Sequence, residues 1–172
     1  MIGPGTAQTT SESGLGDLIL AGTLNAYPDA GSDLPYLELT AKVKVPTADE
    51  DKGLGTGEID YSLQADVFKS FGTVTPFATL GYKVRGDVDG FELNDGLFAS
   101  AGAVVKMSEK LSLGGAYDFR EAATDTSEDA SEVSPFVNFK VTPDVMLTTY
   151  GIFGFSDGSP DSGLGVQLRK NF

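Results

Sequence analysis

Alternation of apolar and polar residues with a period of two is the strongest pattern in this sequence. In the segment 57–69, Ile59, Tyr61 and Leu63 alternate with Asp60 and Ser62. A β-strand points successive side chains to opposite faces, whereas a helix repeats its apolar positions every three or four residues. Nine such segments are legible, at 15–26, 36–46, 57–69, 75–86, 96–107, 110–121, 132–141, 145–156 and 163–172. The sequence therefore predicts an all-β protein.

The length of the segments and their connections favour a membrane barrel. Strands of soluble sheets usually have about five or six residues, whereas a tilted strand needs about ten to span a bilayer, and most of the nine segments reach that length. Short connections at 71–75, 108–110 and 142–144 alternate with long acidic ones at 47–57, 86–96, 121–132 and 156–163. Short turns on one rim and long loops on the other are typical of an antiparallel transmembrane β-barrel.

A soluble sandwich also alternates, and the composition of the polar faces favours the barrel over it. These faces carry charges of both signs near mid-strand and many Gly, Ser and Thr residues, which suit a narrow bore. The residues predicted to line the lumen are Glu38, Lys42, Lys44, Glu58, Asp60, Asp66, Lys83, Arg85, Lys106, Asp118, Arg120, Lys140 and Arg169. Two interpretations stay open: a cross-braced network that plugs the bore, or a polar path whose charges select solutes.

Aromatic residues cluster near the predicted strand ends. They are Tyr27, Tyr36, Phe68, Phe71, Tyr82, Phe119, Phe139, Phe153, Phe155 and Phe172. Such residues form girdles at the two interfaces of a membrane barrel. The alternative is that they are ordinary core aromatics.

Composition excludes several classes of function. The 172 residues include no Cys and no His, which removes disulfides, zinc thiolate sites, cysteine nucleophiles and Ser-His-Asp catalysis. We therefore expect no enzymatic activity, no metal and no cofactor. A formal charge of −13 argues against nucleic-acid binding. No apolar run is long enough for a transmembrane helix, and the N-terminus lacks the pattern of a signal peptide.

The sequence is predicted to form one domain, with an irregular N-terminal segment at 1–13 and the barrel at 14–172. If the C-terminus is periplasmic, the first of nine strands starts outside, so nine strands cannot close with both ends periplasmic. Single-chain bacterial barrels are usually even-numbered. Three outcomes stay open: a tenth strand from the N-terminal segment, the absence of upstream strands from this chain, or an unusual barrel. The N-terminal segment has the composition of a loop, so a truncated or engineered form of a larger barrel is favoured.

The last strand carries a candidate assembly signal. Leu164, Val166, Leu168 and Phe172 share one strand face. This stripe resembles the C-terminal signature that the assembly machinery of bacterial outer-membrane barrels reads. Lys170 departs from a fully apolar stripe, and its long side chain is expected to snorkel to the headgroups.

A second resemblance concerns the stretch "KVPTADEDKGLGTGEID". It shows a K-x-P-T-x-D…G-x-G-x-G-x-x-D segment formed by Lys44, Pro46, Thr47, Asp49, Gly53, Gly55, Gly57 and Asp60. With "GLGD" at 14–17 and "SDGSPDSGLG" at 156–165, it is similar to a family of transporter-like outer-membrane proteins associated with meta-pathway (MetA-type) phenol degradation. The resemblance implies a barrel in the outer membrane that passes small aromatic or apolar compounds.

The sequence thus predicts a passive channel in the bacterial outer membrane. Its expected partners are the lipid bilayer, lipopolysaccharide, the barrel assembly machinery during biogenesis, and small-molecule solutes. The alternatives are a structural or surface-interaction barrel with a plugged lumen, and an engineered scaffold. In the acidic loop, Asp49, Glu50, Asp51 and Glu58 either bind Ca²⁺ or form a solvated loop, and the second is favoured.

Overall fold

The fold is an antiparallel β-sheet. The computed structural model describes residues 12–28, 33–88, 90 and 92–171. Its strands are β1 (Leu18–Ala26), β2 (Tyr36–Val45), β3 (Asp60–Phe68), β4 (Val74–Val84), β5 (Gly96–Lys106), β6 (Leu111–Arg120), β7 (Ala130–Thr142), β8 (Val145–Gly154) and β9 (Ser162–Lys170). One 3-10 turn, η1 (Glu50–Lys52), lies between β2 and β3. The nine predicted strands are confirmed, with boundaries that agree within three residues.

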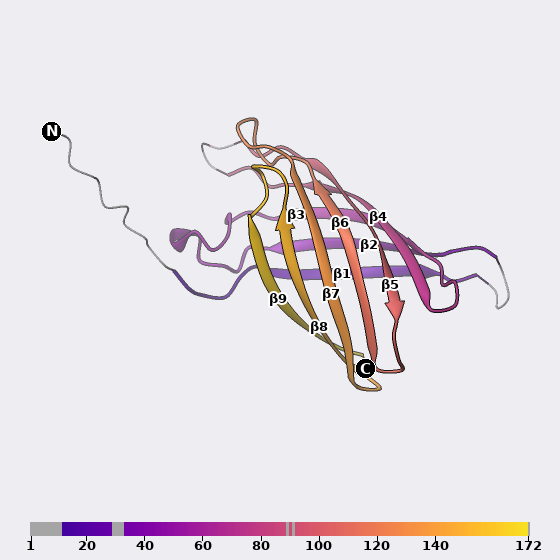
Figure 1. Ribbon diagram of the computed structural model, residues 1–172. Helices are drawn as coiled ribbons and strands as arrows, with labels where there is room; N and C mark the ends of the chain where they lie inside the picture. Colours follow the sequence, from indigo (N-terminus) through magenta and orange to yellow (C-terminus); the bar gives the residue numbers. More distant parts are fainter. Residues whose placement is uncertain (1–11, 29–32, 89, 91, 172) are drawn as a thin grey trace.

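Each strand pairs with its neighbours in the sequence. The strand order is β1 to β9 without crossovers, and every pair is antiparallel. The sheet curls into a half-barrel, with β1 and β9 as its two edges (Figure 1). The all-β antiparallel prediction is therefore confirmed. Within the described residues β1 and β9 do not pair with each other, and no tenth strand lies between them.

The register divides the side chains between two faces. Across β2 and β3, Leu39 lies opposite Ala65, and Lys44 lies opposite Asp60. Residues directly opposite each other point to the same side, so apolar residues share one face and charged residues the other. Leu63 is 62% exposed, whereas Asp60 is 5% exposed. Side chains crowd together inside a curled sheet, so the charged face is the concave face and the apolar face is the convex face.

No layer of protein covers the convex face in the part of the chain that the structure describes. Among the described residues, Ala130 is the only apolar residue that is buried. Large apolar side chains on the convex face remain exposed, among them Leu20, Leu39, Leu80, Leu97, Leu113 and Val166. Soluble proteins rarely expose contiguous apolar patches larger than a few hundred Å². The described sheet therefore builds almost no hydrophobic core of its own.

Strand β9 shows the predicted division of its side chains. Leu164, Val166 and Leu168 lie on the convex face, in register with convex residues of β8, and Leu164 is 94% exposed. The concave positions are Gly163, Gly165, Gln167 and Arg169. Phe172, the last residue of the predicted assembly signal, lies outside the described residues. So does most of the irregular segment predicted at 1–13, of which only 12 and 13 are described.

The connections differ in length between the two ends of the sheet. Connections 46–59, 85–95, 121–129 and 155–161 lie at one end, and 69–73, 107–110 and 143–144 at the other. β1 ends and β2 begins at the second end as well, so a longer stretch of sequence accompanies the three short turns there. In the described part of the chain, no helix is long and apolar enough to cross a membrane.

Strand β7 contains the main irregularity of the sheet. Its pairing with β8 is recorded at Val133 and at Phe136, but not at Ser134 and Pro135 between them. Proline has no N–H to donate to the neighbouring strand, which accounts for the interruption. A second irregularity, a shift of register, lies near the end of the strand between Lys140 and Thr142.

Gly102 on β5 has no room for a side chain against the backbone of β6, which gives the first prediction. A Cβ atom at Gly102 would lie 2.2 Å from the carbonyl oxygen of Gly115 and 2.9 Å from Cα of Ala116. The backbone must move to accept it, so we expect Gly102→Ala to lower the free energy of unfolding by about 1–3 kcal/mol. Urea-induced unfolding of the purified protein measures this. The control is Gly22→Ala, because a Cβ there meets nothing within 4 Å, and equal stability of the two variants would contradict the close approach.

Candidate functional site: the concave face and its rim

The concave face collects most of the residues predicted to line a lumen. Of the thirteen, eleven lie in strands at concave positions: Glu38, Lys42, Lys44, Asp60, Asp66, Lys83, Lys106, Asp118, Arg120, Lys140 and Arg169. Glu58 and Arg85 lie in the loops that precede β3 and follow β4. The structure thus brings the eleven to one surface, while their role in an enclosed bore stays a prediction.

Asp60 is the centre of the most buried charge network. Its Oδ2 lies 2.7 Å from Nζ of Lys83 and 3.1 Å from Nζ of Lys44. Its Oδ1 accepts a hydrogen bond from the Gly86 N–H at 3.2 Å. A buried carboxylate is costly unless charged partners and hydrogen bonds satisfy it. Asp60 at the start of β3 therefore ties together β2, β4 and the loop that follows β4.

Asp17 fixes the start of the loop between β2 and β3. Its Oδ1 accepts hydrogen bonds from the N–H groups of Thr47 at 3.1 Å and Ala48 at 3.0 Å, and its Oδ2 lies 3.5 Å from Nζ of Lys44. The Leu18 N–H donates to Oγ1 of Thr47 at 2.9 Å. The hydrogen bond from Ala48, together with the positive charge of Lys44, lowers the pKa of the Asp17 carboxyl despite its partial desolvation. The loop is thus held at the β1 side of the rim by an ionised carboxylate.

A chain of hydrogen bonds joins β2, β3 and β4 on the concave face. Lys42 Nζ donates to Oε1 of Gln64 at 2.5 Å, and Gln64 Nε2 donates to Oδ2 of Asp66 at 2.7 Å. Thr79 Oγ1 donates to the other oxygen of Asp66 at 2.6 Å. These bonds link β2 to β3 and β3 to β4. They run along the wall of the half-barrel.

The other half of the concave face has its own pair of bonds between neighbouring strands. Arg120 on β6 forms an ion pair with Glu132 on β7, which is 4% exposed. Ser134 on β7 donates a hydrogen bond to Oδ2 of Asp118 on β6 at 2.8 Å. Asp118 and Glu132 lie directly opposite each other, and their carboxylates would repel each other without partners. Arg120 and Ser134 offset that repulsion.

Four aromatic side chains on the concave face were not among the residues predicted to line the lumen. Phe77, Phe98, Phe136 and Tyr150 occupy concave positions in β4, β5, β7 and β8. The sequence contains a signal for them in their parity, that is, in whether a residue has an odd or even position in its strand. Each of the four belongs to the alternating set that carries the polar residues of its strand, as Phe98 does with Ser100. The concave face is therefore both charged and aromatic.

The predicted aromatic girdles are partly wrong. Tyr36 and Phe68 lie opposite each other at concave positions, and their rings stack with centroids 5.3 Å apart. Tyr27 makes an edge contact with Tyr36 and donates a hydrogen bond to Glu38. Proximity to a strand end does not decide the face of a residue; its parity does. By parity, Tyr82, Phe119, Phe139 and Phe153 lie on the convex face.

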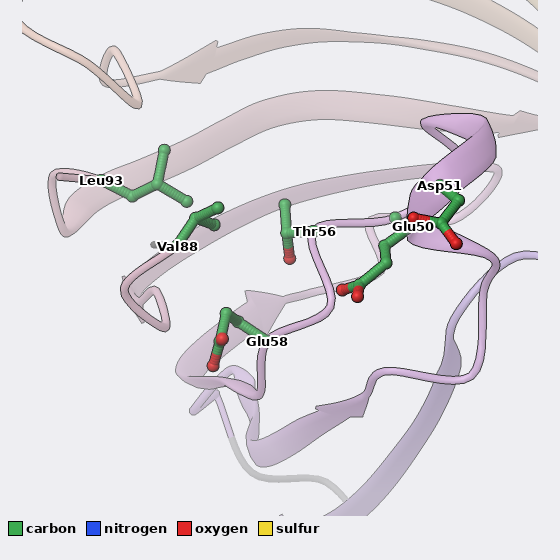
Figure 2. Close-up of a pocket in the computed structure, with 7 residues that line it drawn as sticks. Glu50, Asp51, Thr56, Glu58, Val88 and Leu93 are labelled. Carbon is green, nitrogen blue, oxygen red and sulfur yellow. The ribbon is translucent and has the colours of Figure 1, made fainter. Parts of the chain in front are cut away.

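An open cavity of about 570 Å³ lies at the rim between the loops 46–59 and 85–95. It is lined by Glu50, Asp51, Gly55, Thr56, Glu58, Val88 and Leu93. Figure 2 shows Glu50 and Asp51 at one end of the cavity and the apolar Val88 and Leu93 at the other. The described residues contain no group of three or more carboxylates placed to hold a metal ion.

Glycines shape this loop. Gly53 ends η1 in the left-handed region with φ of 69°, and its N–H donates to the carbonyl oxygen of Glu50. Gly57 has φ of 72°, and a Cβ there would lie 1.8 Å from the Glu50 carboxylate. Both positions need glycine, the first for its backbone angle and the second for its angle and the absence of a side chain. Two of the three regularly spaced glycines of the loop thus have a conformational cause.

Comparison with known families identifies the chain. The family model described as "Putative MetA-pathway of phenol degradation" matches residues 2–170. The protein belongs to this phenol-degradation family. No curated protein matches the chain significantly.

The geometry explains the motif through which the sequence resembles the phenol-degradation family. Lys44 and Asp60 form the central ion pair, and Thr47 joins the start of β1 to the loop. Lys44 Nζ also donates to Oγ1 of Thr56 at 2.7 Å, which ties the glycine-rich part of the loop to the same group. The motif therefore encodes a folded rim loop, anchored by one lysine.

Removing the Asp60 carboxylate tests this network. Asp60→Ala leaves Lys44 and Lys83 without their common partner, and we expect a loss of about 1.5–3 kcal/mol in the free energy of unfolding. We also expect faster proteolysis within the loop 46–59. The control is Lys52→Gln, because Lys52 and Asp49 form an exposed pair that contributes little. If both variants unfold and are cleaved like the parent protein, Asp60 does not organise the rim.

Proposed function

We propose that this protein is a bacterial outer-membrane β-barrel through which small apolar or aromatic molecules cross the membrane passively. It needs no cofactor or energy input for this, and it is not an enzyme. Its partners are the lipid bilayer, lipopolysaccharide at the loop-bearing rim, the barrel assembly machinery and the solutes that cross. Membership of the phenol-degradation family supports a link to the uptake of aromatic compounds.

The exposed convex face is the observation that carries this proposal. A single apolar residue is buried in the described part of the chain, while leucines, valines and aromatics cover the convex face. In water, an apolar surface of this extent drives association. In a bilayer the same surface meets hydrocarbon, and the antiparallel ladder pairs the backbone groups of the interior strands. Lipid is the environment in which this sheet needs no second layer.

The arrangement of bonds on the concave face supports an open path. The ion pairs and hydrogen bonds of Asp60, Asp66 and Glu132 join neighbouring strands. Charges satisfied along the wall do not need partners from the opposite side of a barrel. A bore braced in this way leaves its centre to solvent and solutes.

A structural barrel with a plugged bore is the second candidate. It is favoured by the acidic residues of the rim loops, because Glu50, Asp51 and Glu58 line an open cavity there. In this function the acidic rim loops, which hold the cavity beside Glu50 and Glu58, contact other surfaces or lipopolysaccharide. The two candidates differ in whether ions pass.

Planar-bilayer recording separates the candidates. We expect the refolded protein to produce stepwise current, to require detergent in solution and to migrate differently on gels before and after heating. Heat-modifiable migration without current would favour the plugged barrel. A protein that remains monomeric in plain buffer would exclude both.

Lysine placed on either face tests which one meets lipid. Ala101 is a convex residue of β5, and its neighbour Ser100 is a concave residue opposite Asp118. We expect Ala101→Lys to lower the free energy of unfolding in a bilayer by about 2–4 kcal/mol. Ser100→Lys should be tolerated, because the new ammonium group faces a carboxylate. Unfolding of both variants in lipid vesicles measures the difference, and the reverse order of stability would place the convex face in water.

A further inference from the structure

Four aromatic rings on the concave face each lie over a glycine of a neighbouring strand. A Cβ atom built on Gly81 would lie 2.1 Å from Cζ of Phe98, and one built on Gly102 would lie 2.7 Å from Cζ of Phe77. The same holds for Gly114 with Phe136 at 2.3 Å and for Gly165 with Tyr150 at 2.2 Å. In each couple, the ring and the glycine are direct partners in the register.

The end of each ring therefore rests on the neighbouring strand. Cζ is the ring atom farthest from the backbone, and in each couple it lies where the glycine side chain would be. The rings thus extend along the wall of the half-barrel, with the glycines as their seats. The four aromatic side chains are half-buried, so part of each ring stays open to the concave side.

Two of the couples form one continuous row. Phe136 and Tyr150 lie opposite each other on β7 and β8, and their glycine seats lie on the flanking strands β6 and β9. The row therefore runs Gly114, Phe136, Tyr150 and Gly165 across four strands. The two rings extend in opposite directions from the seam between β7 and β8. A row of this kind presents a broad aromatic surface without narrowing the bore.

We propose that these glycine-seated rings form a binding surface on the concave face that selects planar aromatic solutes. The inference rests on the proposed channel function and specifies the residues that set its solute preference. Aromatic faces attract other aromatic rings through stacked and edge contacts that non-planar rings do not make as well. The glycines leave room for the rings to lie along the wall, so that a solute can pass over them.

Permeability to two matched anions tests the selection. Benzoate and cyclohexanecarboxylate carry the same charge on a six-membered ring, but only benzoate is planar. From reversal potentials in planar bilayers, we expect the protein to pass benzoate about two- to tenfold better. Phe136→Leu and Tyr150→Leu should each move this ratio toward one. The control is Phe139→Leu, which removes a ring from the convex face of the same strand and should leave the ratio unchanged.

Replacing one of these glycines by alanine tests separately whether the rings need the space that the glycines leave. The atoms nearest to a Cβ at Gly165 all belong to the ring and hydroxyl of Tyr150. Gly165→Ala therefore lifts this ring off the wall, and we expect a smaller unit conductance. Adding Tyr150→Leu to the same chain should restore the conductance, because the shorter side chain clears the new methyl group. Gly22→Ala is the neutral control, and heat-modifiable migration shows that each variant has folded.

The failures of the two proposals are distinguishable. If the parent protein gives no current at all, the channel function itself fails. If current is present but benzoate and cyclohexanecarboxylate pass equally well, or the ratio survives both Leu variants, the channel stands and the aromatic surface is overturned. An unchanged conductance of Gly165→Ala would overturn the role of the glycine seats.

Discussion

An apolar face without a protein partner is the constraint on which the rest of this structure depends. Each strand places leucine, valine, alanine or an aromatic residue on its convex side, and almost none of these residues is buried by the described chain. Apolar surface left in water costs about 25 cal/mol per Å², so exposing this face to water is unfavourable. A hydrocarbon environment removes that cost. It also requires that backbone groups be paired, which the antiparallel ladder achieves for the interior strands β2 to β8.

The same alternation determines the chemistry of the concave face. When the apolar positions lie on one side, charged residues, small residues and aromatic rings, four of them over glycines, are left for the other. Charges in a confined space need partners, and Asp60 finds two lysines and an N–H group at the rim. Rings in a confined space need room, and glycines of the neighbouring strands provide it. Both the ion pairs and the ring–glycine contacts join adjacent strands, so they stabilise the wall without contacts across the bore.

The sequence was sufficient to predict the strands and the face of most residues, because the alternation of faces can be read within one strand without knowing its partner. Nine segments and eleven of the lumen candidates were identified by counting in twos. Contacts that depend on register could not be found in this way. Neither the partners of Asp60 nor the seat of Tyr150 on Gly165 follows from one strand alone. Tyr36 and Phe68 were misassigned because their position near strand ends was given more weight than their parity.

The two edges of the sheet also bear on how the barrel is completed. Eight antiparallel steps separate β1 from β9, so the two strands run in the same direction, and a direct contact would be the only parallel pair. An odd number of further strands between them would pair antiparallel with both edges and give the even count of bacterial single-chain barrels. Natural sheets protect exposed edges with proline, bulges or inward charges. Neither β1 nor β9 contains proline, and each pairs with its one neighbour without a register shift, although β9 carries one inward charge, Arg169. Both edges thus have the regular backbone of interior strands, as completion by further strands requires.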